Sequence, residues 1–234
     1  CDQWELGRED LDAFAVESHR RACAAASAGH FEKEVVPVPV MQVREKGAEG
    51  EAHLFSADET IRPGTAVEKL ATLKTSFRAD GRLTAGNSSQ ISDGAAGLLL
   101  MSSVKARSLG LKPRARILAM TTVGSDPTLM LTGPVAATRK VLAQAGLTLD
   151  DIDLFEINEA FASVPLVWMK ELGVSSERLN VNGGAIALGH PLGASGARIM
   201  TSMLHELERR GGRYALQAIC CAGGMGTATL IERL

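Results

Sequence analysis

The sequence RARILAMTTVG, residues 114–124, begins a stretch in which strand-like and helix-like segments alternate as far as residue 234. Further strands are predicted at DIDLFEIN (151–158), LNVNGG (179–184), YALQAICCA (214–222) and GTATLIERL (226–234). Helices are predicted at PVAATRKVLAQAG (134–146), EAFASVPLVWMKELG (159–173) and GASGARIMTSMLHELERRGG (193–212). Such alternation is typical of a layered α/β domain with a largely parallel sheet. The last two strands, joined by a tight glycine turn, are expected to pair antiparallel.

The residues before 114 are less regular. Apolar residues at helical spacing predict a helix over 8–28, and VVPVPVMQV (35–43) reads as a strand whose prolines favour a sheet edge. The polar, turn-rich segment 44–65 is expected to run over the surface, and a short helix is expected over 67–72. The apolar run AAGLLLM (95–101) suits a buried strand, although a helix remains open.

Composition excludes several classes of protein. Of 234 residues, 45 % are apolar and 22 % are charged, which is the balance of a folded globular chain rather than a disordered one. No apolar run approaches the ~20 residues of a membrane span, so no membrane association is expected. The net charge of −2 gives no general attraction to nucleic acid. The chain begins at Cys1 without a signal peptide, and we expect it to be part of something longer.

Cysteine usage points to a reducing compartment. The chain has four cysteines, Cys1, Cys23, Cys220 and Cys221, and the last two are sequence neighbours that rarely bridge each other without strain. A disulfide scaffold is therefore not expected, and a cytoplasm-like location is favoured. No C-x-x-C pair is present, so no zinc site is predicted.

The first motif that could serve catalysis or binding is Asn158-Glu159-Ala160-Phe161, where a predicted strand gives way to a helix. An asparagine there can lie at the carboxyl edge of the sheet, which is where ligands of α/β proteins usually bind. The alternative is that Asn158 caps the helix, which is common at such a position and which the motif taken alone favours.

The second motif is GGAIALGHPLGASGAR, residues 183–198, which holds five glycines and His190 before a helix. A backbone so rich in glycine can turn sharply and approach a ligand closely. His190 can then act as a base or a hydrogen-bond donor near neutral pH, or it can be an ordinary histidine of a surface loop. The segment matches neither the dinucleotide nor the P-loop phosphate pattern.

The third motif is CCAGGMG, residues 220–226, at the end of a predicted strand. Side chains alternate along a strand, so Cys220 and Cys221 are expected on opposite faces, one of them exposed at the sheet edge. Two buried structural cysteines are the alternative.

In this order, NEAFA, the glycine-histidine motif and C-x-A-G-G-M-G resemble the thiolase family. The resemblance also covers GREDLDAFA (7–15), DETIRPGT (58–65), LTAGNSSQISDGAAGLLLMS (83–102) and DPTLMLTGPVAATRK (126–140). It implies a thiolase-type acyltransferase, an acetyl-CoA acetyltransferase or 3-ketoacyl-CoA thiolase of fatty acid metabolism. Such an enzyme makes or cleaves a 3-ketoacyl-CoA by Claisen exchange with acetyl-CoA through a cysteine thioester.

The resemblance also implies roles for individual residues. His190 matches the base that activates the nucleophilic thiol and then helps to hold the thioester oxygen. Cys220 matches the acid/base cysteine that exchanges the α-proton of acetyl-CoA, and Cys221 is expected to be structural. Asn158 would anchor a water that forms one oxyanion hole together with His190. All three side chains are expected to converge on one pocket.

Contacts to CoA carry over to Phe77, Ser89, Met130 and Phe161. Gln90 departs from the family pattern, which usually has a small residue beside Ser89, and this is expected to narrow or tilt the pantetheine channel. CoA and acyl-CoA are substrates here, and the resemblance implies no metal and no redox cofactor.

The nucleophile's own motif is absent from the sequence, so the nucleophile is expected outside this segment, in a missing N-terminal half of the same or another chain. The expected division is a lid-like loop domain over 1–82, the last elements of the N-terminal thiolase domain over 83–113, and a C-terminal domain over 114–234. The C-terminal half is expected to be complete, with the order βαβαβαββ, and the N-terminal half only partly present.

Other functions remain open at this point. A truncated relative could be a non-catalytic CoA-binding or oligomerisation module, and a Cys-His hydrolase using Cys220 and His190 is a weaker possibility. The resemblance implies a homodimer or homotetramer acting on acyl-CoA, with no nucleic-acid partner. The ending LIERL lacks the peroxisomal S-K-L signal, which favours a cytoplasmic site.

Overall fold

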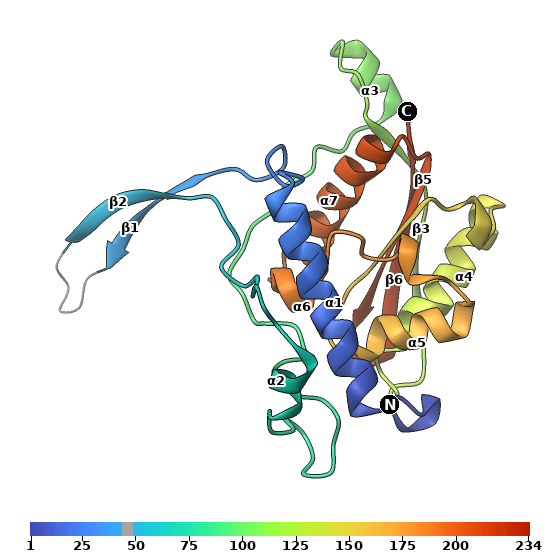
Figure 1. Ribbon diagram of the computed structural model, residues 1–234. Helices are drawn as coiled ribbons and strands as arrows, with labels where there is room; N and C mark the ends of the chain where they lie inside the picture. Colours follow the sequence, from blue (N-terminus) through green and yellow to red (C-terminus); the bar gives the residue numbers. More distant parts are fainter. Residues whose placement is uncertain (44–48) are drawn as a thin grey trace.

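The structure, a computed structural model, describes residues 1–43 and 49–234 and is organised around a four-stranded sheet (Figure 1). The strands are β3 (Ala115–Gly124), β4 (Leu154–Ile157), β5 (Tyr214–Cys221) and β6 (Met225–Arg233), in the spatial order β3-β6-β5-β4. The last two strands pair antiparallel as predicted. Strands β3, β5 and β4 run in the same direction, as a largely parallel sheet requires, whereas β6 lies between β5 and β3 and pairs antiparallel with both. Within this sheet, direct parallel pairing joins β4 to β5.

Helices α4 (Gly133–Ala145) and α5 (Ser163–Leu172) cover one face of this sheet. Trp168 on α5 is fully buried, and its ring lies 5.0 Å from that of Phe155 on β4, centroid to centroid. Its indole N–H donates a 2.9 Å hydrogen bond to Thr138 Oγ1 on α4. A buried polar group needs such a partner, so this bond fixes how the two helices pack on the sheet.

Helix α7 (Ser195–Arg210) covers the opposite face. Met203 and Leu207 of α7 pack against Leu154, Ala215 and Ile231, which lie on β4, β5 and β6. The sheet is therefore buried on both faces, and a layered α/β fold is confirmed.

Two expected strands are corrected by the structure. Residues 179–184 contribute only a single parallel bridge, between Leu179 and Phe155, because Asn180 turns the chain with a positive φ of 43°. The apolar run 95–101 forms neither strand nor helix, and Leu99 is 81 % exposed. A short helix, α3 (Ser103–Ser108), follows that run.

The first third of the chain forms an elongated layer beside this domain. Helix α1 (Arg8–Ser27) and helix α2 (Val67–Ala71) lie close to their predicted positions. Between them, β1 (Val38–Val43) pairs antiparallel with β2 (Glu49–Phe55), and the hairpin projects away from the other elements (Figure 1). The expected surface excursion over 44–65 therefore contains a strand, and residues 44–48 lie outside the described part.

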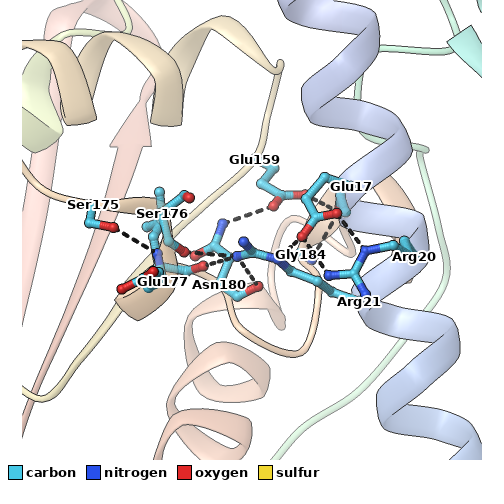
Figure 2. Close-up of polar contacts among 11 residues, drawn as sticks. Glu17, Arg20, Arg21, Glu159, Ser175, Ser176, Glu177, Asn180 and Gly184 are labelled. Carbon is cyan, nitrogen blue, oxygen red and sulfur yellow. Dashed lines mark hydrogen bonds and ion pairs between the residues drawn. The ribbon is translucent and has the colours of Figure 1, made fainter.

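Short helical segments complete the described chain. These are η1 (Asp2–Trp4), η2 (Leu149–Asp151), η3 (Ser176–Arg178), α6 (Ala185–Leu188) and η4 (Ala222–Gly224). Helix α1 packs on α6, with Leu11 and Ala15 of α1 in one apolar cluster with Ile186. Arg21 of α1 donates to the carbonyl oxygens of Leu179 at 2.5 Å and Ser176 at 3.0 Å (Figure 2). These contacts attach α1 to the loop that precedes the glycine-rich segment.

Candidate active site

Three sequence motifs meet at the ends of β4 and β5. Asn158 follows the last residue of β4, and its backbone N–H donates a 3.0 Å hydrogen bond to the carbonyl of Ala218 on β5. Cys220 lies two residues beyond Ala218 on the same strand. His190 follows α6, whose last turn ends at Gly189 with a φ of 84° that favours glycine.

The Asn158 side chain lies between the other two. Its Nδ2 is 3.4 Å from His190 Nε2. The same side chain lies close enough to Cys220 to lower the pKa of its thiol, against the larger effect of burial. The residues that the sequence analysis singled out are thus brought to one place, from three different segments of the chain.

The ring of His190 is oriented by its neighbours. Nδ1 lies 2.6 Å from Ser195 Oγ, and that hydroxyl donates to the carbonyl oxygen of Pro191 at 3.0 Å. Since the hydroxyl proton is used there, Ser195 Oγ accepts from Nδ1–H, and the lone pair of Nε2 faces Asn158. Burial, together with the positive charge of Arg198, lowers the pKa of His190 below its usual value of 6.5. The imidazole is therefore neutral at pH 7 and able to take a proton at Nε2.

Cys220 is held as a thiol. Burial raises its pKa from 9.0 to about 11, which outweighs the opposing hydrogen bonds from its own backbone and from Asn158. A group that is protonated at neutral pH can act as a proton donor, and its conjugate thiolate is a strong base. Cys220 packs on the core between the sheet and α4 and α5, whereas the Cys221 sulfur lies 4.0 Å from the Ile219 carbonyl oxygen.

Asn158 carries a buried oxygen without a protein partner. The residue is 2 % exposed, and its Oδ1 accepts no hydrogen bond within the described part of the structure. A buried carbonyl oxygen normally has a partner, so this atom is suited to hold a water or a ligand group. The helix-cap alternative for Asn158 is not observed, because α5 begins only at Ser163 and its N-cap residue is Ala162.

The four expected CoA contacts fall into two groups. Phe77 and Phe161 meet edge to face with centroids 5.7 Å apart, and Phe77 is 70 % exposed. The backbone N–H of Ser89 donates to the carbonyl of Ala160 at 3.0 Å, which places Ser89 beside Phe161. Met130 lies on the loop between β3 and α4, in a left-handed conformation with a φ of 52°. The same loop is bonded to the turn between β5 and β6, because the Ser125 hydroxyl donates to the Gly224 carbonyl at 2.7 Å.

Two residues that hold His190 were not identified from the sequence. Ser195 orients the imidazole, and the only sequence signal is a serine five residues after the histidine at a helix start. Gln90 acts through its backbone carbonyl, which accepts from the His190 N–H at 3.0 Å. Its side chain turns toward the 58–65 loop, where the guanidinium of Arg62 donates to Oε1 at 3.3 Å.

The described residues contain no group of three or more His, Cys, Asp or Glu side chains that could hold a metal ion. No helix within 1–43 or 49–234 is long and apolar enough to cross a membrane.

Family models identify the class of protein that this fold and site define. Residues 1–104 match the thiolase N-terminal domain, and residues 111–233 match the thiolase C-terminal domain. The chain belongs to the thiolase family.

Individual relatives agree with this assignment. The chain is 50 % identical to acetyl-CoA acetyltransferase of Chromobacterium violaceum over 99 % of its own length and 58 % of the relative. It is also 50 % identical to 3-ketoacyl-CoA thiolase of Cronobacter sakazakii, over 98 % of its own length and 59 % of the relative. The chain thus spans less than two thirds of the curated relatives it matches.

Two solved structures share the fold. The crystal structure of Bacillus anthracis acetyl-CoA acetyltransferase superimposes with a TM-score of 0.94 at 45 % identity, covering 100 % of this chain and 58 % of that one. Human mitochondrial 3-ketoacyl-CoA thiolase gives a TM-score of 0.90 at 41 % identity, covering 99 % of this chain and 57 % of that one. The thiolase-like fold is therefore established for the described residues.

Proposed function

We propose that the chain supplies the proton-transfer and oxyanion side of an acyl-CoA C-acyltransferase that makes or cleaves a 3-ketoacyl-CoA. The observation that carries the proposal is the position of Asn158, whose Nδ2 lies 3.4 Å from His190 Nε2 and whose side chain also lowers the pKa of the Cys220 thiol. Those three groups are a base, a proton donor and a hydrogen-bonding amide. A Claisen exchange with acetyl-CoA needs proton transfer at a thiol and at a carbon, together with stabilisation of the enolate oxygen.

In this proposal, His190 is the base that takes the proton from the nucleophilic thiol. Its Nε2 lone pair is directed into the site by the Nδ1–Ser195 contact, and its lowered pKa keeps the ring neutral before the reaction. Once protonated, Nε2–H becomes a donor. It then stabilises negative charge on the thioester oxygen, and each such donor contributes about 3 kcal/mol to lowering the barrier.

Cys220 exchanges the α-proton of acetyl-CoA. In cleavage, the thiol protonates the departing enolate, and a pKa of about 11 keeps that proton available at neutral pH. In condensation, Cys220 first releases its proton to solvent, and the thiolate that forms then removes the α-proton of acetyl-CoA. The unpartnered Oδ1 of Asn158 would hold the water that completes the oxyanion site beside His190.

The covalent nucleophile is proposed to come from a segment outside residues 1–234, in the same or another chain. We divide the chain into a lid-like 1–82, an N-terminal-domain remnant 83–113 and a C-terminal domain 114–234. Phe77, Ser89, Met130 and Phe161 are proposed CoA contacts, with CoA as substrate. A role in fatty acid metabolism, a cytoplasmic location and a homodimer or homotetramer are further proposals from the family resemblance.

A non-catalytic CoA-binding or oligomerisation module is the competing function. It makes no use of the His190 orientation or of the buried thiol, so the presence of both favours the enzyme. A Cys-His hydrolase is disfavoured because the pKa of Cys220 is raised, whereas a hydrolytic nucleophile needs a lowered one.

The test is exchange of the methyl protons of acetyl-CoA with solvent, followed by proton NMR in D₂O. This reaction needs the proton-transfer groups but no acyl-enzyme. We expect residues 1–234 to exchange these protons, and His190→Asn to slow the exchange by at least about a hundredfold. Binding of acetyl-CoA without any exchange by the unaltered chain would instead identify a non-catalytic module.

A further inference from the structure

Glu159, the residue after Asn158, has a role that the proposed chemistry does not use. It is 1 % exposed, and its carboxyl group accepts three hydrogen bonds. Oε1 accepts from Asn180 Nδ2 at 2.9 Å, while Oε2 accepts from Ser18 Oγ at 2.7 Å and from the Ile186 N–H at 3.1 Å. Figure 2 shows Glu159 facing Asn180 beside α1.

These donors come from three segments that meet behind the active site. Ser18 belongs to α1, Asn180 to the turn after η3, and Ile186 to α6, which leads within four residues to His190. Ser18 Oγ also accepts from the Gly184 N–H at 3.1 Å, so the carboxyl group and α1 together hold both residues of this turn. The carboxyl group of Glu159, the residue after Asn158, thus holds the segment that leads to His190.

Gly184 is adapted to the same contact. A Cβ at this position would overlap the carboxyl carbon and both carboxyl oxygens of Glu159. The glycine therefore allows the backbone of the 184–186 turn to approach the carboxyl group closely enough for hydrogen bonding.

Asn180 Nδ2 and the Ile186 N–H donate to opposite oxygens of the Glu159 carboxyl group, and neither can become an acceptor there. Asn180 Oδ1 accepts from the Ile157 N–H at 2.8 Å, and Asn180 Nδ2 donates to the Ile157 carbonyl at 2.8 Å, so its amide is locked. Ile186 presents a backbone N–H, which has only one polarity. A group at position 159 must therefore offer an acceptor on both sides, which a carboxyl group does and a primary amide does not.

We propose that Glu159 is a positioning residue that fixes Asn158 relative to His190 by holding the 184–186 turn against the end of β4. Its expected effect on catalysis rests on the function proposed above. Burial raises the pKa of Glu159, and the bonds from Ser18, Asn180 and Ile186 oppose that rise. Both oxygens can accept in either protonation state, so the positioning does not depend on the charge.

The test compares Glu159→Gln with a matched buried carboxylate, Glu206→Gln. Glu206 is also buried, and it accepts from Asn182 Nδ2 at 2.9 Å and from Arg209 Nε at 2.9 Å, but it contacts neither Asn158 nor His190. Three measurements are made on each variant: amide hydrogen exchange at Gly184 and Ile186, the ring ¹⁵N shifts of His190, and acetyl-CoA proton exchange.

For Glu159→Gln we expect amide exchange at Ile186 to accelerate about tenfold or more and the His190 shifts to move. The kcat of proton exchange should fall by up to about a hundredfold with KM nearly unchanged, because misplacement affects the reacting geometry more than CoA binding. Glu206→Gln should lose thermal stability while keeping the His190 shifts and kcat of the unaltered chain.

The inference is overturned if Glu159→Gln leaves the Ile186 exchange and the His190 shifts unchanged, or if Glu206→Gln lowers kcat equally. If Glu159→Gln does not fold, Ser18→Ala removes one donor and should accelerate exchange at Gly184. No acceleration there counts against the inference. If the unaltered chain exchanges no acetyl-CoA protons, the proposed function fails, whereas amide exchange and ring shifts still decide the role of Glu159.

Discussion

Cys220 and Cys221 are sequence neighbours with different surroundings, and this difference predicts different consequences of substitution. Cys220 packs on the core beside α4 and α5, and Asn158 lowers the pKa of its thiol, whereas the Cys221 thiol lies near the Ile219 carbonyl. We expect Cys220→Ser to reduce acetyl-CoA proton exchange by at least about a hundredfold, since a general acid or base contributes roughly that much or more. Cys221→Ser should change exchange by less than about twofold and act mainly on stability.

The measurement is the proton-exchange rate of both variants, with near-UV circular dichroism to establish that each remains folded. Equal loss of activity in two folded variants would contradict the assignment of Cys220.

At the same scale, the site residues differ in how far the sequence could predict them. Asn158, His190 and Cys220 carry distinctive side chains inside glycine-rich or strand-end motifs, so they could be singled out, and their roles stay predictions. Ser195 could not, because a serine at the start of a helix is usually explained as a cap. Gln90 contributes a backbone carbonyl, and every residue has one.

At the scale of the element, strand β4 contains a buried carboxylic acid, Glu156, near Arg198 of α7. Burial raises the pKa of Glu156 from 4.5 to about 8, and nearby Arg198 only partly opposes this. Between these two pH values the folded chain holds a proton that the unfolded chain has released. The free energy of unfolding should therefore fall as pH rises from about 4.5 to 8, with a contribution from this group of up to roughly 1.4 kcal/mol per pH unit.

Glu156→Gln removes that contribution, so its stability should vary less steeply with pH over this window and should exceed that of the unaltered chain near pH 8. Urea unfolding at pH 5, 6.5 and 8 measures it. Glu17→Gln is the control: Arg20 and Arg21 lower the pKa of Glu17 to about 2, so its linkage lies below pH 4.5 and the slope above pH 5 should not change. Parallel pH curves for Glu156→Gln and the unaltered chain would show that Glu156 is ionised when folded.

The order of these elements was predictable, but their pairing was not. Periodicity places α4, α5 and α7 close to their observed bounds, because each buries one apolar face on the sheet. It does not say that β6 inserts between β5 and β3, since hydrogen-bonding partners are not encoded in one strand's pattern. The apolar run 95–101 lacks a buried partner within the described residues, so hydrophobicity alone predicted a strand that does not form.

At the scale of the whole molecule, several large apolar side chains are exposed to solvent. Leu99, Leu100, Val104, Leu192 and Met120 are all exposed. Exposed apolar area of this kind is typical of a surface that packs against further protein. We expect residues 1–234 to self-associate as concentration rises, which sedimentation velocity over a hundredfold dilution range measures; a strictly monomeric chain throughout would contradict this.

The same whole-molecule view predicts that residues 1–234 alone do not cleave acetoacetyl-CoA with CoA. In the reaction proposed above, one thiol carries the acyl group and another transfers the proton. Of the four cysteines, Cys220 is the one whose pKa is influenced by Asn158. Cys1 packs beside α1 and α2, Cys23 lies on α1, and the Cys221 sulfur lies 4.0 Å from the Ile219 carbonyl oxygen. With Cys220 used for the proton, no second thiol of this chain serves as the carrier. Proton exchange on acetyl-CoA should therefore proceed while thiolysis, followed by the absorbance of the magnesium enolate, stays at the uncatalysed rate. Adding the part of a relative that this chain does not cover, such as that of the Chromobacterium violaceum enzyme, should restore thiolysis. Thiolysis by residues 1–234 without that addition would mean that one of the four cysteines is the acyl carrier, and the role of Cys220 would have to be reassigned.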